Sequence, residues 1–430
     1  MLGFFYTFVM YLLQPFLLLF MLGRSIKSPD YRRRISERYG LFYAELERPQ
    51  PNGIIIHAAS VGEVIAATPL VRQIQTEYPN LPITVTTVTP TGSARVKAAF
   101  GDSVSHFYLP YDLPDAVTRF INFIQPKACI VIETEIWPTL IHQLKLRNIP
   151  FIVANARLSA RSAKRYAWAK NHIKTVLNEI SLIAPQDSIS GQRYTDLGYQ
   201  GRLVLTGNIK YDLEISDELL NDIISLEQQW IGNRPVWIAG STHEGEEEII
   251  LQTHRTLLQQ FPNLLLILAP RHPERFNSVA NLIEKEKFSY CRRSEDIAPS
   301  AQTQILLGDT MGELMLMYGV SDVAFVGGSL VKHGGHNPLE PLAFKLPVIS
   351  GKYVFNFPEV FLKLRYVLGV LTVKSDANAL AEAVSRFLHS KALRQRFGQA
   401  GYEVLVENRG ALKRLIGLLR PYLENEQVEK

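Results

Sequence analysis

The stretch Phe325–Phe344, FVGGSLVKHGGHNPLEPLAF, decides how the chain is expected to fold. An apolar run ends in two glycine pairs, and a helix is predicted to follow. Asn337 is a favoured N-cap, Pro338 suits the first helical position, and Glu340 stands where the acid of a capping box stands. A strand, a glycine-rich loop and a helix N-terminus can together hold an anion through backbone N–H groups. An ordinary strand-to-helix connection would look the same, so this stretch alone leaves both interpretations open.

The same strand-and-loop pattern recurs through the second half of the chain. Four apolar runs end in polar or glycine-bearing loops, which read GSTHE, PRHPE, GDTMGE and GGHNPLE. Apolar runs that alternate with helical stretches predict βαβ units and a parallel sheet, whose carboxyl ends face a ligand crevice. Arginine, histidine, hydroxyl groups and helix N-termini suit a phosphate. The pattern therefore predicts a binding site for an anionic ligand.

The first half repeats the alternation but carries acids at its strand ends. GIIIH at 53–57 predicts a strand, and Glu63 follows it either as the capping-box partner of Ser60 or as a group in a ligand crevice. ACIVIETEIWP predicts a strand that ends in Glu133 and Glu135, two residues apart and so on one face. Acids at such a place are costly unless solvated, paired or used, and we favour a functional role for Glu133. Lys210, in TGNIKYD, is ambiguous by itself.

Length and composition predict two folded domains. The chain has 430 residues, of which 47% are hydrophobic and 20% charged. An acid-rich helical stretch without a strand separates the two βα series. The expected organisation is an N-terminal membrane anchor (1–23), a first Rossmann-like domain (24–212), a connector (213–233), a second Rossmann-like domain (234–405) and a closing helix (406–430).

The N-terminal residues predict a membrane anchor. No charged residue precedes Arg24, and FFYTFVMYLLQPFLLLFML is apolar almost throughout. About 20 apolar residues suffice to span a bilayer, and the absence of charge before them argues against a cleaved signal peptide. Arginines at 32–34 would keep the rest of the chain in the cytoplasm. Because Gln14-Pro15 interrupts the run, a kinked helix lying in the membrane interface is the alternative.

Several other classes of site are disfavoured. Cys129 and Cys291 have neither CxxC spacing nor nearby histidines, so they predict buried thiols and not a disulfide framework or a zinc site. His333 and His336 form HxxH without HExxH, and a loop role is preferred to a metal site. The loops contain no GxxxxGK[ST] or GxGxxG, which argues against a P-loop NTPase and a typical dinucleotide enzyme.

Seven motifs, in order, resemble one family of proteins. They are HAASVGEVIAATPL, ETEIWP, TGNIKYD, GSTHEGEE, APRHPERF, GDTMGEL and GGHNPLEP. Together they look like the 3-deoxy-D-manno-octulosonic acid (Kdo) transferases of lipopolysaccharide assembly. The resemblance implies a GT-B glycosyltransferase, two Rossmann-like domains that close on one crevice. It implies transfer of Kdo from CMP-Kdo to the lipid A precursor lipid IVA at the cytoplasmic face of the bacterial inner membrane.

The resemblance also implies roles for individual residues. Glu63 would be the general base, and Glu133 and Lys210 would stabilise the transition state. CMP would be held by Arg271, His272, Met311, Gly312, Glu313, Asn337, Pro338, Leu339 and Glu340. A nucleoside monophosphate leaving group can be met by these cations without a metal, so no metal and no cofactor are expected. The net charge of +5 suits the anionic membrane surface and a phosphorylated acceptor, and no nucleic-acid partner is expected.

Two rival functions stay open at this stage. One is a GT-B glycosyltransferase with another donor, such as a nucleotide-diphosphate sugar. The other is a non-catalytic, membrane-anchored protein that binds lipid A and keeps the fold. The number of Kdo residues transferred is not encoded in any of these motifs.

Overall fold

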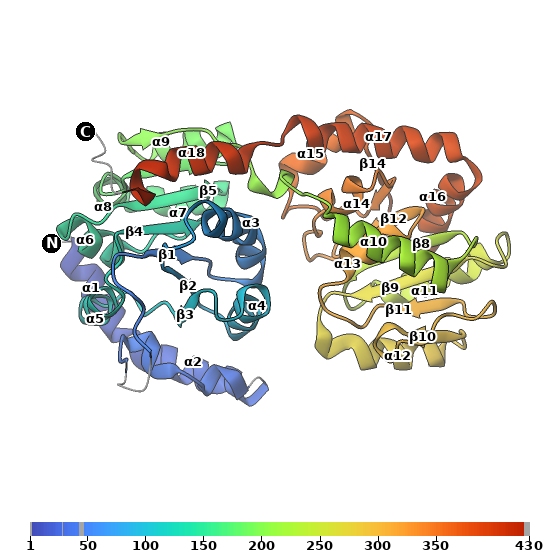
Figure 1. Cartoon of the computed structure of the whole chain (residues 1–430), viewed down its shortest axis with the longest axis horizontal. Coiled ribbons are helices and arrows are strands. Elements are labelled where there is room, and N and C mark those ends of the chain that lie inside the picture. The colour runs from blue at the N-terminus through green and yellow to red at the C-terminus, as the bar shows by residue number, and fades with distance from the viewer. Residues whose placement is uncertain (1, 28, 43–46, 425–430) are drawn as a thin grey trace. The chain divides into compact units, whose positions relative to one another are not determined.

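The computed structural model describes residues 2–27, 29–42 and 47–424, and the chain divides into two compact units (Figure 1). Unit 1 comprises Met1–Asp212 and Arg409–Lys430, and unit 2 comprises Leu213–Asn408. Met1 of the predicted anchor and residues 425–430 of the predicted closing helix lie outside the described residues. Each unit is an α/β layer structure with its own sheet and its own hydrophobic core, as predicted.

Unit 1 is built on a parallel sheet with the strand order β3-β2-β1-β4-β5-β6-β7. Its central strands are β-branched and buried on both sides, which is typical of a sheet covered by helices on both faces. The strands are β1 (Ile54–His57), β2 (Ile83–Thr87), β3 (Ser105–Tyr108), β4 (Ala128–Ile132), β5 (Phe151–Ala156), β6 (Leu182–Pro185) and β7 (Arg202–Leu203).

Alternate residues of these strands pack into two separate hydrophobic clusters, one on each face of the sheet. One face is covered by α3 (Val61–Glu77), α4 (Pro90–Phe100) and α18 (Ala411–Leu423). The opposite face is covered by α5 (Pro114–Ile124), α6 (Pro138–Leu146), α8 (Lys170–Leu177) and α9 (Ser188–Asp196), with α7 (Ala160–Ala167) beside them. The sheet is therefore doubly wound.

The final helix α18 is held in unit 1 by Asp212. Both carboxylate oxygens of Asp212 accept backbone N–H groups at the start of α18, from Gly410 at 2.5 Å and from Leu412 at 2.6 Å. Arg414 donates to the carbonyl of Thr206 at 2.7 Å. The chain therefore returns to unit 1 at the point where it first leaves it.

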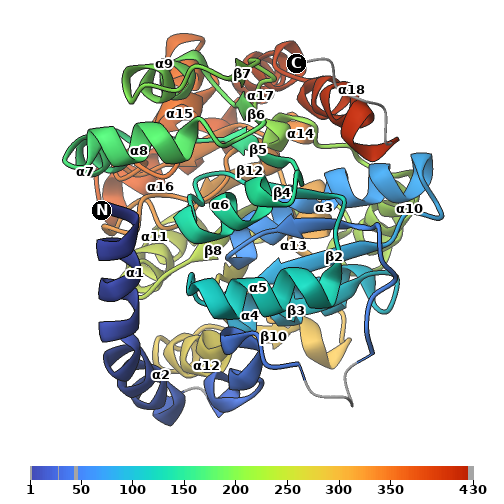
Figure 2. The same cartoon turned by 90° about the vertical axis from the view of Figure 1, so that its left-hand side faces the viewer.

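The N-terminal helices α1 (Leu2–Leu12) and α2 (Gln14–Lys27) are separate helices, and Figure 2 shows the change of direction between them. Among the described residues no single helix is long and apolar enough to cross a membrane, whereas Phe5–Leu12 and Gln14–Ile26, bent by 40°, satisfy the length and composition together. Pro15 lies in the first turn of α2 and lacks the N–H that a continuous helix would use.

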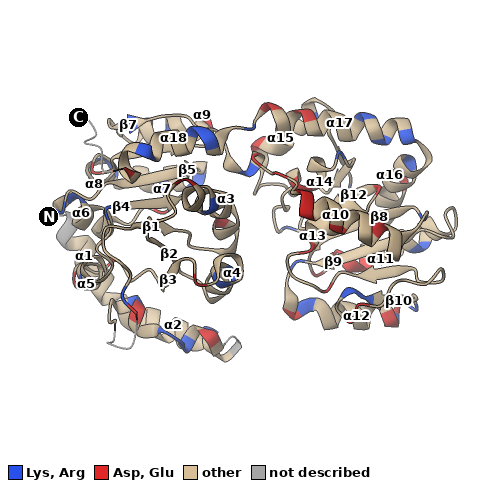
Figure 3. Cartoon of the chain, in the orientation of Figure 1, with Lys and Arg blue, Asp and Glu red and all other residues tan. Residues whose placement is uncertain are grey.

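The α1 helix, which carries no charged residue (Figure 3), is hydrogen bonded to the body of unit 1. The hydroxyl of Tyr6 donates to Asp112 at 2.8 Å, and that of Tyr11 donates to Asp115 at 2.6 Å. Of the three consecutive arginines that follow α2, Arg34 points inward and forms an ion pair with the buried Glu37 at 2.5 Å. That arginine is therefore part of the fold of unit 1.

Unit 2 is a second parallel sheet with the strand order β10-β11-β9-β8-β12-β13-β14. The strands are β8 (Val236–Thr242), β9 (Leu265–Pro270), β10 (Tyr290–Arg292), β11 (Ile305–Leu307), β12 (Val323–Val326), β13 (Val348–Ser350) and β14 (Val370–Thr372). In both sheets the first strand of the unit lies in the middle, between its second strand and a later one. The strand order therefore reverses beside β1 in unit 1 and beside β8 in unit 2.

Helices cover both faces of this sheet as well. One face carries α11 (Glu247–Leu258), α12 (Phe276–Lys285), α16 (Ala377–His389) and α17 (Lys391–Glu407). The other carries α10 (Asp217–Leu226), a π-helical turn (Glu227–Ile231) and α13 (Leu314–Gly319), while α14 (Leu339–Ala343) and α15 (Pro358–Tyr366) follow β12 and β13. The stretch 213–233, expected as a connector, lies in unit 2, where Trp230 and Ile231 are buried in the core.

Candidate functional site

Glu63 lies in the first turn of α3, directly after β1, at the carboxyl edge of the unit 1 sheet. Ser60 is the N-cap of α3, as predicted, and its hydroxyl accepts the N–H of Glu63 at 3.4 Å. The Glu63 carboxylate accepts the N–H of Ala59 at 2.7 Å and the hydroxyl of Ser60 at 3.3 Å. The cap therefore holds the carboxylate in one orientation, so the structural and functional interpretations of Glu63 are compatible.

Glu133 follows β4, the strand next to β1, and forms an ion pair with Lys210. The Lys210 Nζ donates to Glu133 Oε1 at 2.6 Å, and the two side chains are 21% and 12% exposed. Glu133 has a φ of 65°, so the backbone leaves the strand there. The expected same-face alternation of Glu133 and Glu135 is wrong for this reason, because alternation requires an extended backbone.

Lys210 is brought to this edge by a short 3₁₀ helix, Ile209–Tyr211. Asn208 caps it by accepting the N–H of Lys210 at 3.0 Å, and Asn155, at the end of β5, accepts the N–H of Ile209 at 3.1 Å. The Lys210 side chain thus reaches Glu133 from a loop that two side-chain amides fix in place.

The carboxyl groups of Glu63, Glu133 and Glu135 gather at this edge. Burial, followed by the negative charges of Glu135 and Glu133, raises the pKa of Glu63 to about 8, against the opposing hydrogen bonds from Ala59 and Ser60. Burial likewise raises the pKa of Glu135. A carboxyl group whose pKa lies near neutrality is suited to taking and giving up a proton at physiological pH.

In unit 2 the four predicted loops follow β11, β9, β8 and β12, which are consecutive neighbours in the sheet. Because all four strands are parallel, the loops share one edge, as predicted. The fully buried Glu246 ties two of them together. Its carboxylate accepts the N–H groups of His243 at 3.0 Å, Gly328 at 2.7 Å, Ser329 at 3.0 Å and Leu330 at 2.9 Å.

Arg271 and His272 lie in the loop after β9. The backbone N–H of Arg271 donates to the carbonyl of Thr242 at 3.0 Å, which fixes this loop to the end of β8. The ring of His272 meets that of His243 edge to face, with 5.3 Å between the ring centroids. Burial, together with the charges of Arg271 and Arg275, lowers the pKa of His272 against the opposing effect of Glu274. The edge is therefore rich in cationic and imidazole groups.

The segment Met311–Glu313 precedes α13 at the same edge. Met311 is 59% exposed, and Gly312 has a φ of 93°, a conformation that favours glycine. Glu313 is bound by Arg293 at 2.8 Å and by the hydroxyl of Thr310. The carboxylate of Glu313 is therefore already neutralised within the protein, and Met311 is the side chain of this segment that is most open to a ligand.

The NPLE segment begins its helix one residue later than predicted. The α14 helix starts at Leu339, with Pro338 and not Asn337 at the N-cap position. The Asn337 side chain accepts the N–H of Leu339 at 3.1 Å and donates to Glu340 at 3.3 Å. Glu340 therefore bonds to a side-chain amide and not to the backbone that a capping box would use. No group of three or more His, Cys, Asp or Glu side chains in the described part of the chain is arranged to hold a metal ion.

Comparison with known proteins matches both units. A family model described as 3-deoxy-D-manno-octulosonic-acid transferase (kdotransferase) matches residues 33–213, and one described as glycosyl transferases group 1 matches residues 199–404. The 3-deoxy-D-manno-octulosonic acid transferase of Haemophilus influenzae is 65% identical over 98% of this chain and 99% of its own length. The chain belongs to the Kdo transferase family. It is therefore a glycosyltransferase.

Solved structures are similar to the chain as well. The UDP-GlcNAc 2-epimerase from Neisseria meningitidis, 13% identical, aligns over 86% of this chain and 99% of its own with a TM-score of 0.58. The C-terminal CMP-Kdo binding domain of WaaA from Acinetobacter baumannii is 34% identical and aligns over 44% of this chain and 99% of its own with a TM-score of 0.43. The two parallel-sheet units are those of the group 1, GT-B-like glycosyltransferase fold.

Sequence reasoning did not single out two features of this Kdo transferase family member. Glu246, which organises the loops after β8 and β12, lies in the quoted GSTHEGEE motif but was not assigned a role. His243 and His336 lie 2.7 Å apart through their Nε2 atoms, although His336 had been considered only with His333. The available signal was that His243 and His336 each follow an apolar run that predicts a strand, within the quoted motifs GSTHEGEE and GGHNPLEP.

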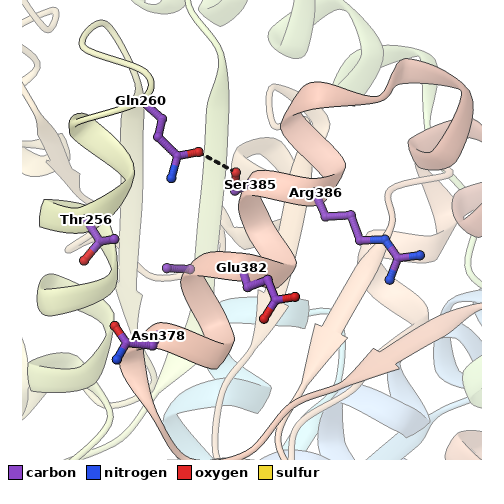
Figure 4. A pocket seen from close by; sticks show the side chains of 7 residues that line it. Thr256, Gln260, Asn378, Glu382, Ser385 and Arg386 are labelled. Atoms are coloured by element: carbon purple, nitrogen blue, oxygen red, sulfur yellow. Dashed lines mark hydrogen bonds between the residues drawn. The ribbon is translucent and has the colours of Figure 1, made fainter.

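A pocket of about 420 Å³ lies elsewhere on unit 2, between α11 and α16 (Figure 4). It is lined by side chains of these two helices and of the turn after α11, where Gln260 accepts the hydroxyl of Ser385 at 2.8 Å. No loop from the carboxyl edge of the sheet contributes to its lining, so it is not part of the candidate site.

Proposed function

We propose that the protein transfers Kdo from CMP-Kdo to lipid IVA with inversion of configuration, and that Glu63 is the general base. The observation that carries this proposal is the position of Glu63. Its carboxylate is fixed beside β1, where the strand order of the unit 1 sheet reverses, and its pKa is raised to about 8. Membership of the Kdo transferase family supports the identity of the transferred sugar.

In the proposed step, Glu63 takes the proton of an acceptor hydroxyl as the oxygen attacks the anomeric carbon of Kdo. The new carbon–oxygen bond forms on the face opposite the leaving group, and the bond from the anomeric carbon to the phosphate oxygen breaks. The electron pair leaves on CMP, and the acceptor proton stays on Glu63. Such general-base assistance typically contributes about 10²–10⁴-fold to the rate.

Glu133 and Lys210 would stabilise the transition state as a pair. Lys210 lies 2.6 Å from Glu133 and supplies a positive charge beside the carboxyl groups of Glu63 and Glu135. The Glu133 carboxylate would favour the positive charge that develops on the sugar ring, while the lysine balances the acidic cluster. Charges held in place before the reaction need no reorganisation during it.

The donor nucleotide would be held by unit 2. Arg271 and His272 would face the phosphate, Met311 and Gly312 would provide a surface for the nucleoside, and Asn337 to Glu340 would lie beside it. The Glu340 carboxylate can accept hydrogen bonds from ribose hydroxyls or from the amino group of cytosine. The proposed reaction requires substrates bound by both units, because the base and the donor residues belong to different ones.

The N-terminal helices would bring the enzyme to the cytoplasmic face of the inner membrane, where its lipid acceptor is found. Their described surface is apolar: Phe5, Phe8, Leu12, Phe16, Leu19 and Phe20 are each at least 57% exposed. An apolar helical surface beside basic residues favours an anionic bilayer. Flotation of the full-length protein with phosphatidylglycerol vesicles, compared with a variant carrying Phe5→Ser, Phe16→Ser and Phe20→Ser, tests this contact. Equal flotation of the two proteins would contradict it.

The direct test of the function is to incubate the purified protein with CMP-Kdo and lipid IVA and to measure the product mass. We expect lipid IVA to gain one or more Kdo units with equal release of CMP, and the spectrum counts the units added. Activity is expected to survive EDTA, because cationic side chains can meet the charge of the leaving phosphate. Stabilisation by UDP instead of CMP in a thermal-shift assay would indicate another donor, and CMP binding without product would indicate a binding protein.

A further inference from the structure

Two histidines of unit 2 form a directly hydrogen-bonded pair at the reversal of the strand order. His243 follows β8, His336 follows β12, and their Nε2 atoms are 2.7 Å apart with ring planes inclined by only 2°. His243 is 8% exposed. In an open α/β sheet, the loops on either side of this reversal are where ligands bind. The pair therefore lies where the donor is expected, although neither residue is assigned to it.

A separation of 2.7 Å fixes the number of protons between the two rings. One Nε2 must carry a proton and donate it, and the other must be an unprotonated acceptor, because two facing N–H groups would repel each other. In the neutral pair the donating ring therefore has an unprotonated Nδ1. The pair can take up one further proton at that Nδ1 and keep the same hydrogen bond, which then becomes charge-assisted.

The surroundings of the pair are rich in basic side chains. His333 stacks on His243 at 4.2 Å, and His272 lies 5.3 Å away. Burial, together with these histidines, Arg271 and Arg275, lowers the pKa of His243 to about 4, and burial with Arg271 lowers that of His336 to about 3. The pair without a ligand is thus neutral at physiological pH.

Three of the acids near the pair have partners within the protein. Glu246 accepts four backbone N–H groups, one of them from His243 itself. Glu247 is paired with Arg275 at 2.5 Å, and Glu340 accepts from Asn337 at 3.3 Å. Glu274 is exposed and opposes the effect of the arginines on His272. A cluster of imidazoles and guanidinium groups in which three of the neighbouring acids are already bonded attracts an anion.

We propose that the His243–His336 pair is a proton-coupled anion site, which takes up one proton when an anionic oxygen of the donor binds and releases it when that anion leaves. The inference rests on the proposed function and deepens it, since the ligand is an oxyanion of the donor. That oxyanion is either the phosphate or the carboxylate of the sugar. Donor affinity then falls as pH rises, because each binding event must draw a proton from an increasingly basic solution.

The test is isothermal titration of the full-length protein with CMP and with CMP-Kdo at pH 8, in two buffers that differ in ionisation enthalpy. At this pH the phosphate of free CMP, with a pKa of about 6, has lost its proton, so the comparison of wild type with the histidine variants is what assigns the uptake to the pair. We expect an uptake approaching one proton. Uptake with both ligands assigns the phosphate as the anion, and uptake with CMP-Kdo alone assigns the sugar carboxylate.

The variants His243→Asn and His336→Gln should each abolish the uptake and weaken binding about tenfold or more, as expected when a charge-assisted contact is lost. His333→Asn is the matched control, since it removes a stacked ring but no hydrogen bond of the pair, and it should retain the uptake. A thermal melt of each variant checks its folding. Proton exchange at Glu63 is common to all these proteins, so the difference between wild type and variants isolates the histidines.

Binding of CMP-Kdo by the wild type without proton uptake would overturn the inference and leave the proposed function intact. Uptake that persists in both pair variants would also overturn it. Absence of any binding of CMP-Kdo would instead contradict the proposed function. The two proposals therefore fail by different measurements.

Discussion

The two units use the same architecture for opposite chemistry. In unit 1 the loops after β1 and β4, on either side of the reversal in strand order, bring together Glu63, Glu133 and Glu135. In unit 2 the equivalent loops after β8 and β12 bring together His243 and His336. Burial raises the pKa of Glu63 to about 8 and lowers that of His336 to about 3. The same topology thus shifts each type of group towards its neutral form, and the residues decide whether the edge carries carboxyl groups or imidazoles.

The largest effect should come from replacing Glu63, the proposed general base at the carboxyl edge of the unit 1 sheet. Glu63→Gln keeps the acceptor for the Ala59 N–H but cannot take a proton, so turnover should fall about 10²–10⁴-fold. CMP affinity, measured by titration calorimetry, should be unchanged, because the residues proposed to bind the donor belong to unit 2. Near-normal turnover would show that Glu63 is only a helix-capping residue. Unit 1 would then not supply the general base, and the proposed division of roles between the units would be wrong.

A smaller loss of activity is expected from breaking the ion pair between Lys210 and Glu133 in unit 1. Lys210→Met leaves Glu133 without its 2.6 Å partner beside two other carboxylates. Loss of a charge-assisted hydrogen bond should lower kcat about 10- to 100-fold. Lys127→Met is the matched control, since Lys127 donates to the carbonyl of Leu423 elsewhere in unit 1. If both variants lost activity equally in a steady-state assay, the effect would be one of stability and not of the site.

Glu340, at the carboxyl edge of the unit 2 sheet, provides the corresponding test for donor binding. Glu340→Ala should weaken CMP binding about 5- to 30-fold, which corresponds to one or two hydrogen bonds of about 1 kcal/mol each. Its effect on the melting temperature should be small, because Glu340 bonds to Asn337 and not to the helix backbone. An unchanged CMP affinity with a lowered melting temperature would assign Glu340 to the fold alone.

The smallest effect concerns stability against pH. The folded-state pKa of Glu63 is raised to about 8, above the ordinary carboxyl value of about 4.3. Between these pH values the folded protein holds a proton that the unfolded chain releases, so this group destabilises the fold increasingly as pH rises. Glu63→Gln removes the effect and should melt about 2 °C or more above the wild type at pH 8, with little difference at pH 4. A difference that shrinks with rising pH would show that the pKa is not raised.

The same pKa sets the pH dependence of transfer. At saturating donor, the wild-type kcat/KM for the acceptor should increase with pH up to about 8 as Glu63 loses its proton. Glu135→Gln removes a negative neighbour of Glu63 and should shift this limb of the profile to lower pH. A profile unaffected by Glu135→Gln would mean that Glu135 does not contribute to the raised pKa of Glu63.

Much of this architecture could be predicted because it depends on neighbours in the sequence. Alternation of apolar runs and helical spacing indicates two parallel sheets, and the polar loops mark their carboxyl edges. Ser60 could be predicted as an N-cap from its spacing to Glu63. The start of α14 was misplaced by one residue, since the same local signals allow either Asn337 or Pro338 as the cap.

What the sequence by itself determined, then, is the fold class, the family and the loops that carry polar residues. Only the tertiary structure decided which of these residues meet, because their contacts join strands that are distant along the chain. Lys210 reaches Glu133 across 77 positions, and His243 reaches His336 across 93. The raised pKa of Glu63 has the same origin, since it depends on burial and on carboxylates that follow another strand. Local spacing specifies the elements, whereas the order of strands in each sheet creates the electrostatic environment in which their side chains act.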